Sequence, residues 1–127
     1  MKLITPVLII RIAAAGNLFI HGMYRLLSGS VYFFEEYLQG VGFPPYVAFA
    51  ITFFEIIASI LILANRWVRI LSICFIAELV AGIIMVHARE GWFVVGGGRN
   101  GMEYSVLLIL CFAALIVSTL SKEAGRS

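Results

Sequence analysis

Charged residues are scarce in this sequence. They make up 13% of its 127 residues, against about a quarter in a typical soluble domain. The net charge is only +2, and no basic patch with interleaved aromatic residues is present. Nucleic-acid-binding domains carry such patches because they neutralise many phosphates. We therefore expect no nucleic-acid partner.

Cysteine and histidine are also scarce, which limits metal and redox chemistry. Cys74 and Cys111 lie within apolar runs without a CxxC spacing, so we predict packing residues rather than a disulfide or redox pair. The two histidines are His21 and His87. A metal site usually takes three or four ligands at recognisable spacing, so none is predicted here. Neutral imidazoles could still bind haem or a quinone carbonyl, although contacts with Glu103 or the backbone fit the sequence better.

Hydrophobic residues make up 62% of the chain and the mean hydropathy is +1.05, which is typical of a membrane protein. They gather in four runs, at residues 3–27, 46–64, 67–87 and 102–120. Crossing a hydrocarbon core of ~30 Å takes about 20 helical residues, and each run is close to that length or longer. We predict an all-α integral membrane protein, a four-transmembrane-helix antiparallel bundle formed by a single domain, residues 1–127.

Two segments that connect the apolar runs also have recognisable patterns. Residues 31–38 mix four aromatic rings with Glu35 and Glu36, which is typical of a short amphipathic helix lying in the membrane interface. Residues 87–104 contain a glycine-rich loop, because the glycines there give the backbone the freedom that ends a helix. This loop either folds into a protein-lined cavity or forms a solvated hairpin that dips its aromatic residues into the headgroups.

The basic residues set the expected orientation, because cytoplasmic loops carry the excess of lysine and arginine. Five lie on the side of the termini and of the turn at Asn65, and three lie on the opposite side. We therefore predict that both termini are cytoplasmic. The five are Lys2, Arg66, Arg69, Lys122 and Arg126, and the three are Arg25, Arg89 and Arg99.

Three ionisable residues fall near the middle of the predicted spans when depth is estimated from the helical rise per residue. They are Arg11, Glu55 and Glu78. An unpaired charge in hydrocarbon is costly, so we predict that Arg11 contacts Glu55, Glu78 or both. This buried polar cluster is either part of a functional site or a pin that fixes the register of the helices.

A second polar layer is predicted nearer the outer face, from His21, His87, Asn100 and Glu103. We predict that the glycine-rich loop folds inward and sets Asn100 and Glu103 beside the two histidines, as candidate ligand-binding or proton-exchange residues. On an ideal helix His87 lies about 180° around the axis from Glu78, so a single site would require a kink in that helix.

Several short motifs follow one another at a definite spacing. They are Arg11, His21-Gly22, Gly42-Phe43-Pro44, Glu55, Arg69, His87 and Glu103-Tyr104. In this order and spacing they resemble the DoxX family over nearly the whole chain. The chain departs from the family pattern where Tyr24-Arg25 replaces a lysine after the His-Gly pair, and Glu78 has no place in it.

The resemblance implies a four-helix protein of the bacterial inner membrane. The family name comes from subunits associated with a terminal quinol oxidase and with thiosulfate:quinone oxidoreduction.

From this resemblance we predict an accessory, non-catalytic integral membrane subunit of a larger respiratory, quinone-linked oxidoreductase complex. Two alternatives stay open. One is a small quinone- or quinol-binding redox protein with a polar pocket on its outer side, and the other is a small transporter lined by the buried charges. The expected partners are membrane lipid and other membrane protein subunits, and a quinone is the cofactor under consideration.

Overall fold

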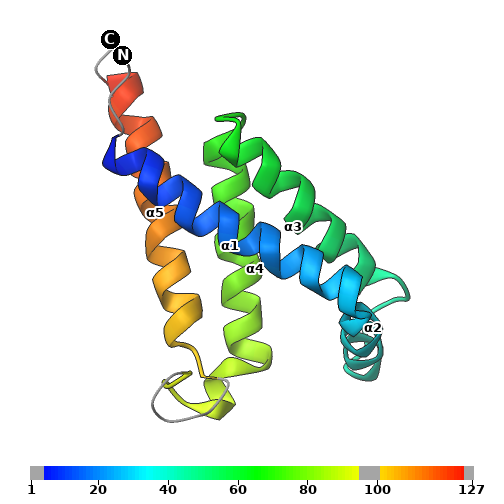
Figure 1. The fold of residues 1–127 in the computed structure, drawn as a ribbon. Helices are drawn as coiled ribbons and strands as arrows, with labels where there is room; N and C mark the ends of the chain where they lie inside the picture. The colour runs from blue at the N-terminus through cyan, green and yellow to red at the C-terminus, as the bar shows by residue number, and fades with distance from the viewer. Residues whose placement is uncertain (1–4, 95–100, 125–127) are drawn as a thin grey trace. The chain divides into compact units, whose positions relative to one another are not determined.

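The computed structural model describes residues 5–94 and 101–124. Within these ranges five α-helices and one short 3-10 helix follow one another, and no strand is present (Figure 1). The all-α prediction is confirmed. The helices are α1 (Pro6–Ser28), α2 (Ser30–Gly40), α3 (Val47–Leu63), α4 (Val68–Met85), η1 (His87–Glu90) and α5 (Glu103–Ala124).

Three of these helices are long and apolar enough to cross a membrane: α1, α4 and the part Glu103–Ser121 of α5. The helix α3 is apolar too, but its 17 residues cover about 26 Å at 1.5 Å per residue. It is shorter than predicted because Tyr46 adopts a left-handed φ of 71° just before the helix, and Ala64 ends it. Three of the four predicted spans therefore form helices long and apolar enough to cross a membrane, and the four-helix bundle stays a prediction.

The chain divides into two compact units, each described here by itself. The middle unit is Ala15–Arg66, which holds the second half of α1 together with α2 and α3. The terminal unit is Met1–Ala14 with Trp67–Ser127, which holds the first half of α1 together with α4, η1 and α5. The prediction that residues 1–127 form a single domain stays a prediction.

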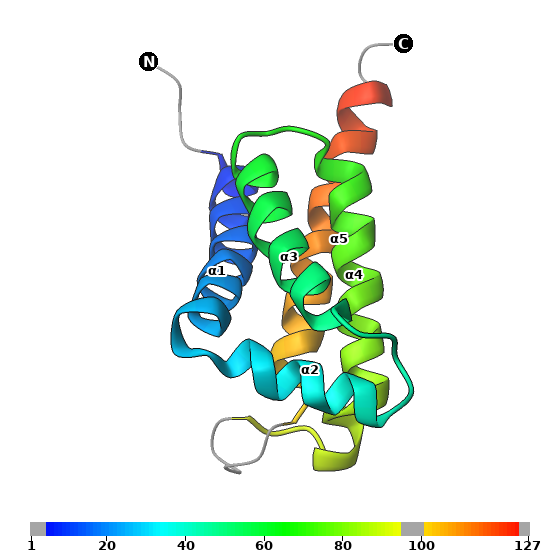
Figure 2. The same cartoon turned by 90° about the vertical axis from the view of Figure 1, so that its right-hand side faces the viewer.

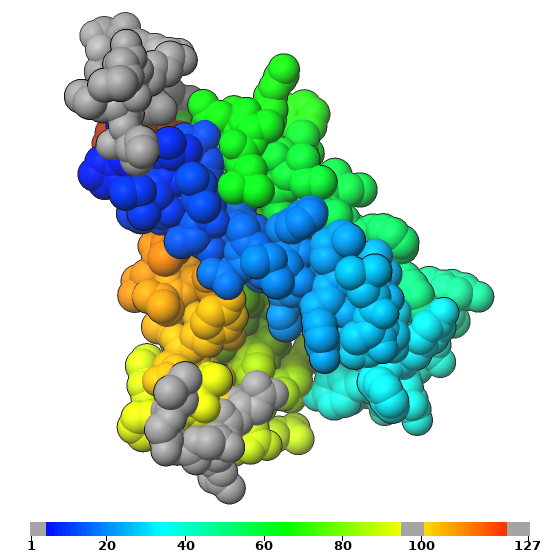
Figure 3. Space-filling model, in the orientation of Figure 1, coloured from blue at the N-terminus to red at the C-terminus, as the bar shows by residue number. Residues whose placement is uncertain are grey.

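In the middle unit, α2 packs against α3 (Figure 2). It buries Val31, Glu35 and Leu38, whose spacing of three or four residues places them on one face. Gly29, with a left-handed φ of 78°, turns the chain from α1 into α2, and Figure 3 shows the end of α1 (light blue) beside α2 (cyan). A helix therefore covers the predicted segment 31–38, and its position in the membrane interface stays a prediction.

In the terminal unit, α4 and α5 lie side by side (Figures 1 and 2). Phe75 of α4 and Phe112 of α5 form the centre of this contact, with ring centroids 5.1 Å apart and neither side chain exposed. Leu108 and Leu115 are buried one turn to either side of Phe112, so one apolar stripe of α5 faces α4. Such a tightly packed pair gives the polar groups at both ends of the two helices fixed positions.

Candidate functional site

The centre of the middle unit is a buried ion pair between α1 and α3. A guanidinium nitrogen of Arg25, Nη1, lies 3.2 Å from Oε2 of Glu55. The two side chains are only 13% and 5% exposed. Because burying a lone charge is costly, the charge of each residue offsets part of the desolvation cost of the other.

Two further contacts complete the surroundings of Arg25. Its Nη1 also donates to the hydroxyl of Thr52 at 3.0 Å, and the Thr52 hydroxyl donates in turn to the carbonyl of Ala48 at 2.8 Å. The guanidinium carbon lies 4.6 Å from the ring centroid of Phe34 on α2, in a cation–π contact. One arginine therefore ties together α1, α2 and α3.

The close approach of α1 to α3 depends on Gly22. A Cβ atom added at this position would lie 2.8 Å from Cγ1 of Ile56 and 3.5 Å from the carbonyl oxygen of Thr52. A side chain here would therefore push the two helices apart. Gly22 and Arg25 are three residues apart on α1, as are Thr52 and Glu55 on α3, so the small residue and the ion pair share one interface.

The structure gives Glu55 a different partner from the predicted one. The sequence names Arg11 as the partner and counts Arg25 only among the basic residues on the outer side, because positions there are estimated from the backbone alone. The long aliphatic stem of an arginine lets its guanidinium lie well away from its own Cα, and this is how Arg25 reaches Glu55. Arg11 is half-buried and belongs to the terminal unit, so its predicted contact with Glu55 or Glu78 stays a prediction.

The predicted outer layer is only partly described. His21 is exposed on α1, whereas His87 is half-buried at the start of η1. The helix predicted to run through 67–87 ends at Met85, so the angle expected between Glu78 and His87 on one ideal helix does not apply. Asn100 lies outside the described residues. That the two histidines lie beside Asn100 and Glu103 stays a prediction.

Glu103 closes the base of the loop between α4 and α5. Its Oε1 accepts the N–H of Val94 at 2.8 Å, and its own N–H donates to the carbonyl of Trp92 at 2.9 Å. The N–H of Met102 donates to Gly91 at 3.0 Å. The carboxylate also sits at the first residue of α5, where the helix dipole favours a negative charge. Residues 91–94 and 101–103 are thus held together, while residues 95–100, the core of the predicted inward fold, lie outside the described ranges.

Glu35 caps the start of α3, a role that the sequence did not indicate. Its carboxylate accepts the N–H of Tyr46 at 2.6 Å, the N–H of Ala48 at 3.2 Å and the side-chain amide of Gln39 at 3.0 Å. Helix N-termini leave such N–H groups without partners inside the helix. The Gln39 amide, with the backbone N–H groups, holds the pKa of Glu35 below its ordinary 4.5, although burial acts in the opposite direction.

Replacing Glu35 with glutamine is expected to lower the melting temperature at neutral pH, because an amide cannot accept all three donors. The pKa of Glu35 is lower in the folded protein than in the unfolded chain. Its contribution to stability is therefore complete above the unfolded pKa and disappears as pH falls through the folded one. Melting curves in detergent from pH 7 to about 3 should show the two proteins converging in acid. Glu36→Gln, on the exposed side of α2, is the control and should melt like the wild type. If the melting temperature of Glu35→Gln stays equally far below that of the wild type in acid, the charge of Glu35 does not have this role.

Metal-binding side chains do not gather in the part of the chain that the structure describes. Among residues 5–94 and 101–124, no three of His, Cys, Asp and Glu are placed to hold an ion. The polar arrangement with defined geometry is instead the group of Arg25, Glu55 and Thr52, with the Phe34 ring beside it. This group brings a cation, a carboxylate, a hydroxyl and an aromatic face together in the interior of the middle unit.

Comparison with known proteins agrees with these features. The profile of the DoxX family matches residues 6–88. A protein of Bacillus subtilis (strain 168) named "Putative oxidoreductase CatD" is 26% identical over 110 residues, which cover 85% of this chain and 76% of that protein. No solved structure matches the chain.

Proposed function

Because this chain belongs to the DoxX family, we propose that it is an accessory, non-catalytic membrane subunit of a larger quinone-linked oxidoreductase complex. Its three helices of spanning length and composition make it a membrane protein. The name of the Bacillus subtilis relative supports the redox link, and the family resemblance supports the association with a quinone-linked enzyme.

The observation that carries the subunit role is the ion pair of the middle unit. Glu55 and Arg25 neutralise each other, and the arginine is further held by Thr52 and Phe34. A buried charge pair that links α1 to α3 in this way fixes the positions of the helices. This supports a scaffold that presents rigid surfaces to partner subunits.

The remaining parts of the proposal concern the membrane. We propose that α3 makes the fourth crossing, since its buried polar residues Thr52, Glu55 and Ser59 all point away from lipid into the protein. A short helix is accommodated by local thinning of the bilayer at modest cost. Both termini then face the cytoplasm, and the bacterial inner membrane is the proposed location. The exposed apolar side chains along α1, among them Ile9, Ile12 and Ile20, would contact lipid or partner helices.

The test is to isolate the tagged chain from its native membrane in mild detergent. We expect other membrane proteins to co-purify in fixed ratio, with the haem or flavin absorption of an oxidoreductase. A matched preparation of the Gly22→Leu variant, in which α1 and α3 cannot approach, should lose these partners. Purification of the wild-type chain alone, without any redox-active partner, would contradict the subunit role.

A second function, quinone binding by the chain itself, is favoured by the aromatic residues of the middle unit. Tyr32 and Phe49 make an edge contact with centroids 5.5 Å apart, and Tyr46 lies 6.5 Å from Phe49. With the guanidinium of Arg25 over the ring of Phe34, the middle unit offers rings for stacking and guanidinium N–H donors for a quinone carbonyl. The same purification distinguishes the two functions. Quinone binding requires that quinone can be extracted from the isolated wild-type chain, and that a folded Thr52→Val variant contains none.

A further inference from the structure

We propose that the pair of helices α4 and α5 is anchored in both lipid–water interfaces of the membrane, by Trp67 at one end and by Trp92 with Phe93 at the other. We call Trp67 the turn anchor, and Trp92 with Phe93 the loop anchor. Both lie within the terminal unit, and they contain the only two tryptophans of the chain. The anchors do not depend on the proposed subunit role, since they require only that α4 and α5 cross the membrane.

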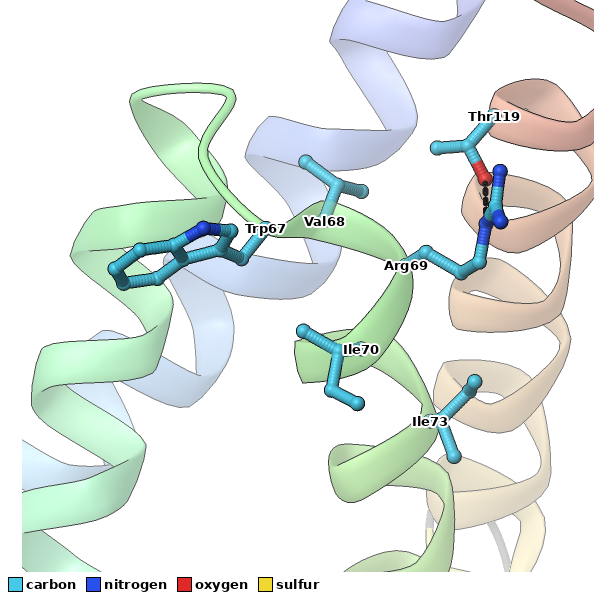
Figure 4. Close-up of a pocket in the computed structure, with 6 residues that line it drawn as sticks. All are labelled: Trp67, Val68, Arg69, Ile70, Ile73 and Thr119. Carbon is cyan, nitrogen blue, oxygen red and sulfur yellow. Dashed lines mark hydrogen bonds between the residues drawn. The ribbon is translucent and has the colours of Figure 1, made fainter. Parts of the chain in front are cut away.

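The two anchors lie at opposite ends of the same span. At one end Arg69, two residues after Trp67, donates from Nε to the Thr119 hydroxyl at 3.0 Å, near the end of the candidate span of α5 (Figure 4). At the other end the N–H of Glu103, the first residue of that span, donates to the carbonyl of Trp92 at 2.9 Å. The 19 residues of the span cover about 28 Å, close to the ~30 Å of a hydrocarbon core. The anchors are therefore separated by about the thickness of the hydrocarbon.

The turn anchor has a strained backbone and an exposed ring. Trp67 has a φ of 50°, in the left-handed region that residues with a side chain rarely adopt. Its side chain is 69% exposed, so contacts within the protein cover only a minority of its surface. Strained residues persist where their surroundings favour the position of the side chain. A membrane interface is such a surrounding, because it accommodates both the apolar ring and the polar N–H of an indole.

An apolar surface continues from the turn anchor into the span. Trp67 lines a recess of about 370 Å³ together with Ile70 and Ile73, which are both exposed (Figure 4). A tryptophan that borders water on one side and aliphatic side chains on the other is typical of the boundary between headgroups and hydrocarbon.

The loop anchor is carried by a backbone that is fixed from within. The carbonyl of Phe93 accepts the N–H of Gly101 at 3.2 Å, and the N–H of Val94 donates to Oε1 of Glu103 at 2.8 Å. A Cβ atom on Gly101 would lie 2.5 Å from the backbone of Trp92, so the two segments are in direct contact. The rings of Trp92 and Phe93 are nevertheless 45% and 55% exposed. The closed base of the loop therefore holds the backbone in place and leaves both rings free to enter a lipid surface.

A lipid interface accounts for these positions better than a partner protein does. Between the two anchors the exposed large side chains of α5 are mostly aliphatic, and the aromatic anchors lie only at the two ends. This change follows the change from hydrocarbon to headgroups across a bilayer. A protein partner would not require it at two levels about 28 Å apart. The exposed aliphatic residues between the anchors are Leu107, Leu110 and Val117.

The experiment uses the fluorescence of the two tryptophans in the full-length protein in phospholipid vesicles. Trp92→Phe leaves the emission of Trp67 alone, and Trp67→Phe leaves that of Trp92 alone. The vesicles contain lipids with a nitroxide quencher either near the headgroup or near the end of the acyl chain. We expect the shallow quencher to act about twofold more strongly than the deep one on each tryptophan.

The depth control is Leu110→Trp in a chain whose Trp67 and Trp92 are both replaced by phenylalanine. Leu110 is 62% exposed and lies about 10 Å from the start of α5, well inside the hydrocarbon. Its tryptophan should be quenched more strongly by the deep label. If Trp67 or Trp92 shows this same preference for the deep label, that residue does not lie in the interface.

Two further measurements test the anchoring itself. In vesicles captured through a C-terminal tag, which hold the protein in one orientation, a water-soluble quencher outside should reach only one of the two tryptophans. Trp67→Ser should melt below Trp67→Phe in vesicles but not in detergent, because a micelle adapts its thickness to the protein. Access to both tryptophans from one side, or an equal loss in detergent and in vesicles, would overturn the anchors. So would quenching by the water-soluble quencher without any by the labelled lipids, which would assign the exposed rings to a partner protein.

Discussion

Replacing Arg25 with methionine is expected to destabilise the protein by about 3 to 5 kcal/mol, the usual cost of removing one partner from a buried ion pair. Methionine fills much of the space of the arginine stem but leaves the Glu55 carboxylate without its cation. Glu55 is 4% exposed, so water cannot replace the lost partner. The loss should appear as a markedly lower melting temperature in detergent.

A double variant distinguishes the pair from the two residues taken singly. Arg25→Met combined with Glu55→Leu removes both charges, so we expect it to be considerably more stable than Arg25→Met alone. Arg66→Met, at an exposed arginine in the turn after α3, is the control and should melt like the wild type. Strictly additive losses in the double variant would contradict a coupled pair.

Replacing Gly101 with alanine is expected to open the base of the loop between α4 and α5. A Cβ atom there would lie 2.5 Å from the carbonyl carbon of Trp92, 2.6 Å from its oxygen and 2.7 Å from the nitrogen of Phe93. All three are backbone atoms, which cannot rotate away as a side chain would. We expect a cost at the upper end of the roughly 1 to 3 kcal/mol typical of overpacking.

The effect of Gly101→Ala should be local. The N–H of Val94, held by Glu103, should exchange with solvent much faster when measured by hydrogen–deuterium exchange, while amides near Phe75 and Phe112 stay protected. Gly40→Ala is the control, because a Cβ at Gly40 meets no atom within 4 Å. Unchanged protection at Val94 in Gly101→Ala would show that the hydrogen bonds between residues 91–94 and 101–103 do not depend on the close approach of Gly101 to Trp92.

The sequence predicted the helices well because their signals are local. The runs at 67–87 and 102–120 correspond to α4 (Val68–Met85) and to most of α5 (Glu103–Ala124). Hydrophobicity and the positions of glycine and proline are enough for such boundaries. The runs at 46–64 and 67–87 both extend past the ends of α3 and α4, because backbone conformations at turns, such as the positive φ of Tyr46 and of Trp67, leave no mark in a hydrophobic pattern.

The contacts between helices were harder to predict, because they depend on side-chain length and on facing surfaces. The sequence analysis counted Arg25 only among the basic residues on the outer side, yet its stem carries the charge to Glu55. The signal that was available is the spacing of Gly22 and Arg25, which puts a small residue and a cation on one face. Glu35 gave no such signal, since its partners Tyr46 and Ala48 are 11 and 13 residues away and meet it only after α2 turns back onto α3.

The pairing of Arg25 with Glu55 also bears on how an energised membrane acts on this protein. A single charge moved across 100 mV gains or loses about 2.3 kcal/mol. The two residues carry opposite charges 3.2 Å apart, so the transmembrane voltage pulls on them almost equally and in opposite directions. The middle unit should therefore keep the same conformation whether the membrane is polarised or not.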